Sequence, residues 1–428
     1  MEGGWTRRRF AKSAALTALG LASPWAWGQS RQNVRPRVLP GVDVLAQDGF
    51  GPLVGRRVGL LTHPAGVGAR GASSIEYLRR AQGVRLSKLF GPEHGIYGNE
   101  KAGVPVQDRV DPRTGLKVYS LYGQYRKPTP EMLRGLEILC IDLQDIGTRS
   151  YTYVSAMKLA MEACFENGVA VVVFARPNPL GGRMVDGPPI DEQWRSYVGA
   201  FPVPYVHGLT IGEIARIAKN VPGWLDLPEQ TRENGRLLVV PMQGWQRSMR
   251  WPQTGLTFVP TSPNIPTPGA ALGYAMTGLG GQLGGWFHGI GSPYPFRLLG
   301  HQRVGWEQLR PALEREGIGG LEFRPTAWRK GREAHTDLYL RVSDPARFRP
   351  TAISFHMMRL ECALTGGNPF ARASESEESS FKKHTGSSAW WAELVRRGAQ
   401  ANVEAYLNQW QQWCATFQSQ SKRFWMYG

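Results

Sequence analysis

Residues 136–174 read LEILCIDLQDIGTRSYTYVSAMKLAMEACFENGVAVVVF, and they indicate the fold class more clearly than any other part of the chain. Leu136–Leu143 is mostly apolar, which predicts a buried central strand. Tyr151–Asn167 places its apolar residues at helical spacing, and Val169–Phe174 is a second apolar strand. A strand, a helix and another strand in this order predict a βαβ unit with parallel pairing.

The same alternation continues on both sides of this unit. The patterns predict further strands and helices, namely strands at Arg56–Thr62, Val84–Phe90, Lys117–Leu121 and Leu237–Val240, and helices at Ser73–Ala81, Thr129–Arg134 and Thr210–Lys219. Repeated βαβ units favour an α/β fold built on a mainly parallel sheet.

The length of 428 residues suggests two domains. A Pro-rich stretch at Phe258–Pro268 predicts the passage between them, so we place one domain at residues 34–260 and a second at residues 261–428. The second part mixes a strand-like segment, Thr336–Val342, with a late helix, Asn402–Phe417.

The N-terminus has the pattern of a twin-arginine export signal. Thr6–Lys12 reads TRRRFAK, Ser13–Ala22 is an apolar run, and Ala26–Gly28 offers a cleavage site. We therefore expect residues 1–28 to be removed and the protein to be periplasmic or otherwise exported. No Cys lies near the cleavage point, and no later segment is apolar for long enough to span a membrane, so no stable membrane anchor is expected.

The chain carries a formal charge of +17, of which residues 1–28 supply only a small part. A basic surface favours polyanions. The Lys and Arg residues are spread along the chain without a basic run or a zinc-finger or RNA-binding signature, so nucleic acid is not the expected partner. For an exported protein, the anionic cell wall is the more natural partner, and a basic surface with no specific partner is the alternative.

Four cysteines are scattered through the sequence without the spacing of a disulfide framework or of a metal site. We expect buried free thiols at Cys140, Cys164, Cys362 and Cys414.

Polar side chains follow several predicted strands directly, and the carboxyl ends of parallel strands meet at one edge of a sheet. They are His63, Glu93, His94, Gln144, Asp145, Arg176 and Asn178. A loop carboxylate beside a His, with a second carboxylate on another strand end, suits general acid–base chemistry such as glycoside hydrolysis.

Other site chemistries fit the sequence less well. His63, His94, Asp145 and His207 are residue types that bind metals, but no pair has zincin-like helical spacing, so no metal is expected. No Gly-x-Ser-x-Gly is present for a serine hydrolase. No Gly-x-Gly-x-x-Gly follows the first strand, so no dinucleotide or other cofactor is expected.

Motifs throughout the chain make it resemble the exo-β-N-acetylmuramidases of glycoside hydrolase family 171. These motifs are Gly59–Thr62, Gly91–Gly95, Val118–Gly123, Arg126–Pro130, Asp142–Gly147, Tyr151–Tyr153, Arg176–Pro179, His207–Thr210, Ser262–Pro266 and Lys383–Ser387. The resemblance implies a Rossmann-like N-terminal domain, a smaller α+β C-terminal domain, and an active-site cleft between them. It also implies release of N-acetylmuramic acid from the non-reducing ends of peptidoglycan fragments.

Within this resemblance, Glu93 matches the family's catalytic glutamate. We expect Glu93 to be the principal acid/base, with His94 and Asp145 tuning or positioning it. The residues expected to bind the sugar are His63, Gln144, Arg149, Tyr151, Arg176, Asn178, His207, Asn264 and His288.

The chain departs from the family pattern in the Gly-rich segment Gly278–Gly291, which is either a flexible loop or a closely packed turn. Relatives carry an acidic stretch here, and in this chain His288 takes the place of the second Glu and Ile290 the place of an Arg. Ala175 also replaces an Asp before Arg-Pro-Asn-Pro. These departures indicate an altered mechanism, an altered substrate or a descendant that only binds. Two hypotheses follow: an exo-acting glycosidase that acts on muropeptides or a related amino sugar, or a cell-wall-binding protein with weakened catalysis.

Overall fold

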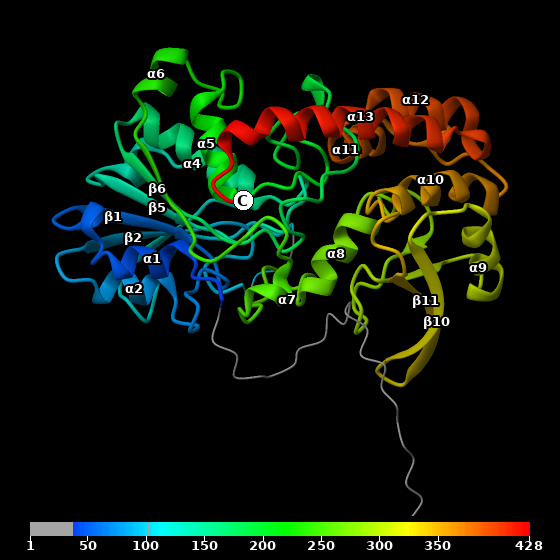
Figure 1. Ribbon diagram of the computed structural model, residues 1–428, viewed down its shortest axis with the longest axis horizontal. Coiled ribbons are helices and arrows are strands. Elements are labelled where there is room, and N and C mark those ends of the chain that lie inside the picture. The colour runs from blue at the N-terminus through cyan, green and yellow to red at the C-terminus, as the bar shows by residue number, and fades with distance from the viewer. Residues whose placement is uncertain (1–36, 99, 101–102) are drawn as a thin grey trace, which may run out of the picture.

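The computed structural model describes residues 37–98, 100 and 103–428 (Figure 1), so the predicted export signal lies outside the described residues. The N-terminal part is built on a seven-stranded sheet of order β3-β4-β2-β1-β5-β6-β7. Its strands are β1 Arg57–Thr62, β2 Arg85–Gly91, β3 Arg109–Val110, β4 Lys117–Ser120, β5 Ile138–Asp142, β6 Ala170–Phe174 and β7 Leu237–Val240. Every pair is parallel except β3 with β4.

This strand order is that of a doubly wound sheet. From β1 the sheet grows through β2 to β4 in one direction and through β5 to β7 in the other, so the strand order reverses between β1 and β5. Thr62 pairs with Asp142 at that point, which brings the loops after both strands together. The predicted α/β class and mainly parallel sheet are confirmed.

Helices cover both faces of the sheet. They are α1 Gly41–Gln47, α2 Ser74–Arg80, α3 Pro130–Leu133, α4 Tyr153–Glu166, α5 Ile211–Asn220, α6 Glu229–Asn234 and α7 Trp251–Thr254. The expected cap of α2 is present, because the Ser73 hydroxyl accepts the Glu76 N–H while the Glu76 side chain accepts the Ser73 N–H. The α4 helix is buried on nearly all sides, as its apolar pattern indicates.

The C-terminal part has a smaller sheet, in which every pair is antiparallel, of order β10-β11-β9-β8. Its strands are β8 Trp286–Phe287, β9 Leu298–His301, β10 Leu321–Lys330 and β11 Glu333–Val342. Its helices are α8 Pro268–Thr277, α9 Trp306–Arg315, α10 Ala352–Leu364, α11 Glu375–Thr385 and α12 Ser388–Arg397. They enclose a separate apolar core, which includes Phe355, Trp390 and Trp410.

The last helix, α13 Val403–Ser421, joins the two parts (Figure 1). Trp410 packs in the C-terminal core, whereas Phe417 packs in the core beneath α4 and α5. Beyond α13 the tail returns to the N-terminal part, where the Met426 N–H donates to Glu213 Oε1 across 3.0 Å. The end of the predicted second domain therefore packs on the first.

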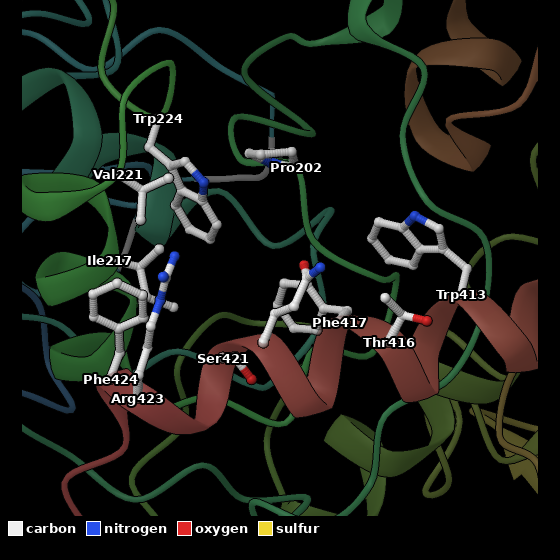
Figure 2. A pocket seen from close by; sticks show the side chains of 11 residues that line it. Pro202, Ile217, Val221, Trp224, Trp413, Thr416, Phe417, Ser421, Arg423 and Phe424 are labelled. Atoms are coloured by element: carbon white, nitrogen blue, oxygen red, sulfur yellow. The ribbon is translucent and has the colours of Figure 1, made fainter.

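A small aromatic pocket of about 170 Å³ lies along α13 (Figure 2). Its walls include Trp224, Trp413, Phe417 and Phe424. None of the residues that we predicted for the site lines it.

The four cysteines are free and buried, as predicted. Among the described residues, none of the helices has both the length and the apolar character that crossing a bilayer requires.

Candidate functional site

Glu93 lies in the loop that follows β2, and it is partly exposed. Its carboxylate accepts two hydrogen bonds. The Gly103 N–H donates to Oε1 across 2.9 Å, and the Thr152 hydroxyl donates to Oε2 across 3.0 Å. Thr152 is the N-cap residue of α4, so the carboxylate faces the N-terminus of a long helix. Two donors fix its orientation while leaving it open to solvent, which suits an acid/base group.

His94 is the next residue in the chain, and its ring forms a hydrogen bond within the same loop. It has a left-handed φ of 70°, a conformation that costs energy outside glycine, and its side chain is buried. Its Nδ1–H donates to the Glu100 carbonyl across 2.8 Å. These contacts describe a residue that holds the turn around Glu93.

Glu93 acts on the ionisation of several tyrosines that the sequence did not single out for the site. Tyr151, which was predicted for it, packs against Tyr153 instead. Burial, and then the Glu93 carboxylate, raise the pKa of the Tyr122 phenol. The pKa of Tyr274 is also raised, mainly by burial, with Glu93 contributing. Because Tyr274 belongs to α8, the C-terminal part contributes to the surroundings of Glu93.

Tyr153 connects Glu93 to the point where the strand order reverses. Its hydroxyl donates to the Thr261 carbonyl across 2.6 Å and lies 3.5 Å from the Glu93 carbonyl oxygen. Its ring packs edge-on against His63, with 4.6 Å between the ring centroids. Tyr151 packs edge-on against Tyr153, and its hydroxyl is buried without a hydrogen-bond partner among the described residues.

His63 and Gln144 meet between the ends of β1 and β5, as the convergence of strand ends predicts. The Gln144 N–H donates to His63 Nε2 across 2.9 Å, and the Gln144 side chain donates to the Asp145 and Pro177 carbonyls. Burial, and then the Arg176 cation, hold the pKa of His63 well below its usual value. His63 is therefore neutral at pH 7.

Asp145 forms a buried pair with His207. Asp145 Oδ2 lies 3.2 Å from His207 Nε2 and accepts the Gly147 N–H across 2.7 Å. The Leu209 N–H donates to His207 Nδ1, which in a neutral ring leaves the proton on Nε2, facing Asp145. Both side chains are almost fully buried, so the pair orders the loops after β5 and before α5.

Two predicted sugar-binding arginines direct most of their donors to groups inside the protein, although the buried Nε–H of Arg149 has no partner among the described residues. Arg149 donates to the carbonyls of Pro188, Val203, His384 and Thr385, and burial lowers its pKa to about 10. Arg176 donates hydrogen bonds to both carboxylate oxygens of Asp142 and to the Val67 carbonyl. These contacts are structural ones, and the substrate roles stay predictions.

The remaining predicted residues are distributed around these groups. Asn178 holds a turn, because it donates to the Leu209 carbonyl and accepts the Leu180 N–H. Asn264 is partly exposed, with no side-chain hydrogen bond among the described residues. His288 packs edge-on against Phe296 at 4.8 Å, and burial lowers its pKa.

The Gly-rich segment around His288 is a closely packed turn. A Cβ on Gly284, which has a φ of 104°, would come within 2.3 Å of the Glu361 carboxyl carbon. The Gly285 N–H donates to that carboxylate, which also faces His301 Nε2 across 3.1 Å. Phe296 packs edge-on against Tyr274 at 5.0 Å, so aromatic contacts run from His288 towards the residues around Glu93.

A cavity of about 510 Å³ opens beyond the end of β1, on the side of the sheet that α2 covers. Its lining includes His63, Tyr97 and Asp111 together with Glu76 and Arg79 of α2. Glu93 is not among the residues that line this cavity. Among the described residues, no cluster of three or more His, Cys, Asp or Glu side chains has the arrangement of a metal site.

The chain matches one known family along nearly all of its described length. A family model described as exo-beta-N-acetylmuramidase NamZ, N-terminal, matches residues 58–269, and its C-terminal counterpart matches residues 272–427. The peptidoglycan beta-N-acetylmuramidase NamZ of Bacillus subtilis (strain 168) is 40% identical over 309 residues, which cover 72% of this chain and 71% of that protein.

Two solved structures of DUF1343 family proteins from Bacteroides fragilis are also similar. One has a TM-score of 0.81 and 35% identity, and the match covers 92% of this chain and 100% of that one. The other has a TM-score of 0.64 and 23% identity, with 91% and 99% covered, and it shows the likeness of fold alone.

Proposed function

The chain belongs to the NamZ family of exo-β-N-acetylmuramidases, and from this membership we propose that it is an exo-acting glycoside hydrolase. Its proposed reaction is the release of N-acetylmuramic acid, or a related amino sugar, from the non-reducing ends of peptidoglycan fragments. The single observation that supports this chemistry best is the partly exposed Glu93 carboxylate, oriented by donors from Gly103 and Thr152.

Glu93 is the principal acid/base in this proposal. In its protonated form it gives its proton to the glycosidic oxygen while the bond between that oxygen and the anomeric carbon breaks. As a carboxylate it then accepts a proton from the water that adds to the anomeric carbon. Asp145 and His207, held 3.2 Å apart, position the loops that surround the sugar.

A second candidate function is motivated by His288, which stands where the family pattern has its second Glu. A buried imidazole with a lowered pKa accepts a proton but supplies no negative charge to an oxocarbenium-like transition state. The candidate is a muropeptide-binding protein with weakened catalysis. Both candidates include export through the twin-arginine signal and a basic surface that favours the anionic cell wall.

Two disaccharides of opposite order test the main proposal. The mature protein is incubated with N-acetylmuramyl-β-1,4-N-acetylglucosamine and, separately, with N-acetylglucosaminyl-β-1,4-N-acetylmuramic acid, and the products are identified by mass spectrometry. We expect cleavage of the first disaccharide only. Binding of the first without cleavage would favour the second candidate, and equal cleavage of both would contradict release of muramic acid from the non-reducing end.

A further inference from the structure

Arg126 is a cation held in place by aromatic rings close to Glu93. Its guanidinium carbon lies 4.2 Å from the ring centroid of Tyr197 and 4.9 Å from that of Tyr122. The residue is exposed, and among the described residues it forms no ion pair and donates no hydrogen bond. Contact with two aromatic faces restrains the guanidinium plane while its N–H groups stay available.

The ring centroids of Tyr122 and Tyr197 lie 5.9 Å apart. The Tyr197 carbonyl accepts a hydrogen bond from the hydroxyl of Ser155, which lies three residues beyond Thr152, the donor to Glu93. Burial, followed by Glu93, raises the pKa of Tyr122, and burial is again the main cause of the raised pKa of Tyr197, which Glu93 raises further. Arg126 opposes these shifts at both tyrosines. The cation and the carboxylate therefore border one tyrosine pair without forming an ion pair with each other.

Three other cationic side chains of the N-terminal part are held by partners within the protein. Arg149 donates to four main-chain carbonyls, and Arg176 is paired with Asp142. Lys127, next to Arg126 in the chain, forms an ion pair with Glu166 across 2.8 Å. Among these four cationic side chains, Arg126 is the exposed one, and among the described residues it forms neither an ion pair nor a hydrogen bond.

We propose that Arg126 is the specificity-determining residue that binds the carboxylate of the substrate's lactyl ether, while Tyr122 and Tyr197 hold its guanidinium plane. This inference rests on the proposed function. N-acetylmuramic acid differs from N-acetylglucosamine by this ether, so its recognition requires a group that prefers a carboxylate. A guanidinium binds a carboxylate through two parallel N–H···O hydrogen bonds, and a fixed guanidinium loses less freedom on binding.

The test compares three chromogenic substrates: a 4-nitrophenyl β-N-acetylmuramide, its lactyl carboxamide, and the 4-nitrophenyl β-N-acetylglucosaminide. We expect the unmutated protein to prefer the carboxylate over the carboxamide. Arg126→Gln should lower kcat/KM for the carboxylate by about 10- to 100-fold, mainly through KM, because a charge-assisted pair is lost. It should leave kcat/KM for the other two substrates within about twofold.

Lys127→Gln is the matched control, because it removes the adjacent cation and is expected to keep the preference for the carboxylate. Arg126→Lys keeps the charge without the planar fork, so an intermediate preference is expected. The inference is overturned if the unmutated protein does not distinguish carboxylate from carboxamide, or if Arg126→Gln keeps the preference unchanged.

A failure of the proposed function gives a different result, namely no release of 4-nitrophenol from the muramide by the unmutated protein. In that case the inference is decided by calorimetric titration with free N-acetylmuramic acid and with its lactyl amide. Tighter binding of the acid by the unmutated protein, lost in Arg126→Gln, supports the role of Arg126, and equal binding of acid and amide contradicts it.

Discussion

The hydroxyl of Thr152 donates to Oε2 of Glu93 across 3.0 Å, although Thr152 is the N-cap residue of α4 and could have capped its own helix. The bond joins residues that lie 59 positions apart in the chain. It places the carboxylate at the positive end of a long, buried helix, whose position is set by the sheet beneath it. The orientation of Glu93 thus depends on the packing of α4.

Thr152→Val should lower kcat while the protein stays folded. Valine keeps the shape of threonine and removes the donor, so the Glu93 carboxylate loses one of its two orienting bonds. A hydrogen bond to a charged group is worth about 1.5–3 kcal/mol, which corresponds to a loss of about tenfold or more. Steady-state kinetics on a chromogenic muramide measure the effect.

Thr416→Val on the exposed side of α13 is the matched control, because that hydroxyl donates within its own helix to the Gln412 carbonyl. Its kcat should equal that of the unmutated protein. An unchanged kcat in Thr152→Val, at unchanged melting temperature, would contradict a role of the Thr152–Glu93 hydrogen bond in catalysis.

Stability should fall as the pH drops below about 6.5, partly because of His63. Burial and Arg176 lower the pKa of His63 in the folded protein, so below pH 6.5 the unfolded chain binds more protons than the folded one. The stability that the lowered pKa of His63 contributes is fully present above the pKa of His63 in the unfolded chain. It is lost as the pH falls towards the pKa of His63 in the folded protein. Its slope is about 1.4 kcal/mol per pH unit.

His63→Gln isolates this effect, because a Gln side chain offers an acceptor to the Gln144 N–H without titrating. We expect urea unfolding curves between pH 7 and pH 5 to show a shallower loss of stability for the variant. Other histidines with a lowered pKa, such as His288, are present in both proteins, so their effect on stability cancels when the two pH profiles are subtracted. Parallel pH profiles would show that His63 titrates as it does in the unfolded chain.

The N-terminal sheet could be predicted from the sequence because its strands are short apolar runs separated by helical periodicity. Residues 136–174 contain β5, α4 and β6 with ends within about two residues of the prediction. Helices α8 to α12 were not predicted. One of them, α9, carries Pro311 inside the helix, which hides its pattern.

The position of Glu93 could also be predicted, since a polar loop after a strand is a local signal. The partners of Arg149 could not, because they are carbonyls from segments as distant as Thr385. Arg126 was not predicted as a site residue, because its guanidinium is held by the ring of Tyr197, which is remote in the sequence. The motif Arg126–Pro130 was the available signal, but local sequence does not show which cations stay unpaired.

A buried ion pair of the N-terminal part should stabilise the packing of the C-terminal tail, because both of its members contact that tail. Glu213 Oε1 lies 2.7 Å from Arg247 Nη1 with both side chains buried, and Arg247 stacks on Trp425. Glu213→Gln should lower the free energy of unfolding by about 3–5 kcal/mol, because it leaves the Arg247 charge buried without its partner. Guanidinium denaturation measures this loss.

Glu314→Gln is the matched control, since Glu314 forms an exposed pair with Arg310 across 2.8 Å. Its expected cost is below about 1 kcal/mol. A cost of similar size for both variants would contradict the view that the Glu213–Arg247 pair fastens the tail to the first domain.

The measurement that bears most directly on the proposed function is the release of N-acetylmuramic acid from N-acetylmuramyl-β-1,4-N-acetylglucosamine by the mature protein and by Glu93→Gln. A Gln side chain keeps the size of Glu and cannot donate an acid proton, so the expected rate falls by about 10²–10⁴-fold while binding of the disaccharide is kept. Equal rates for the two proteins would contradict the assignment of Glu93 as the acid/base.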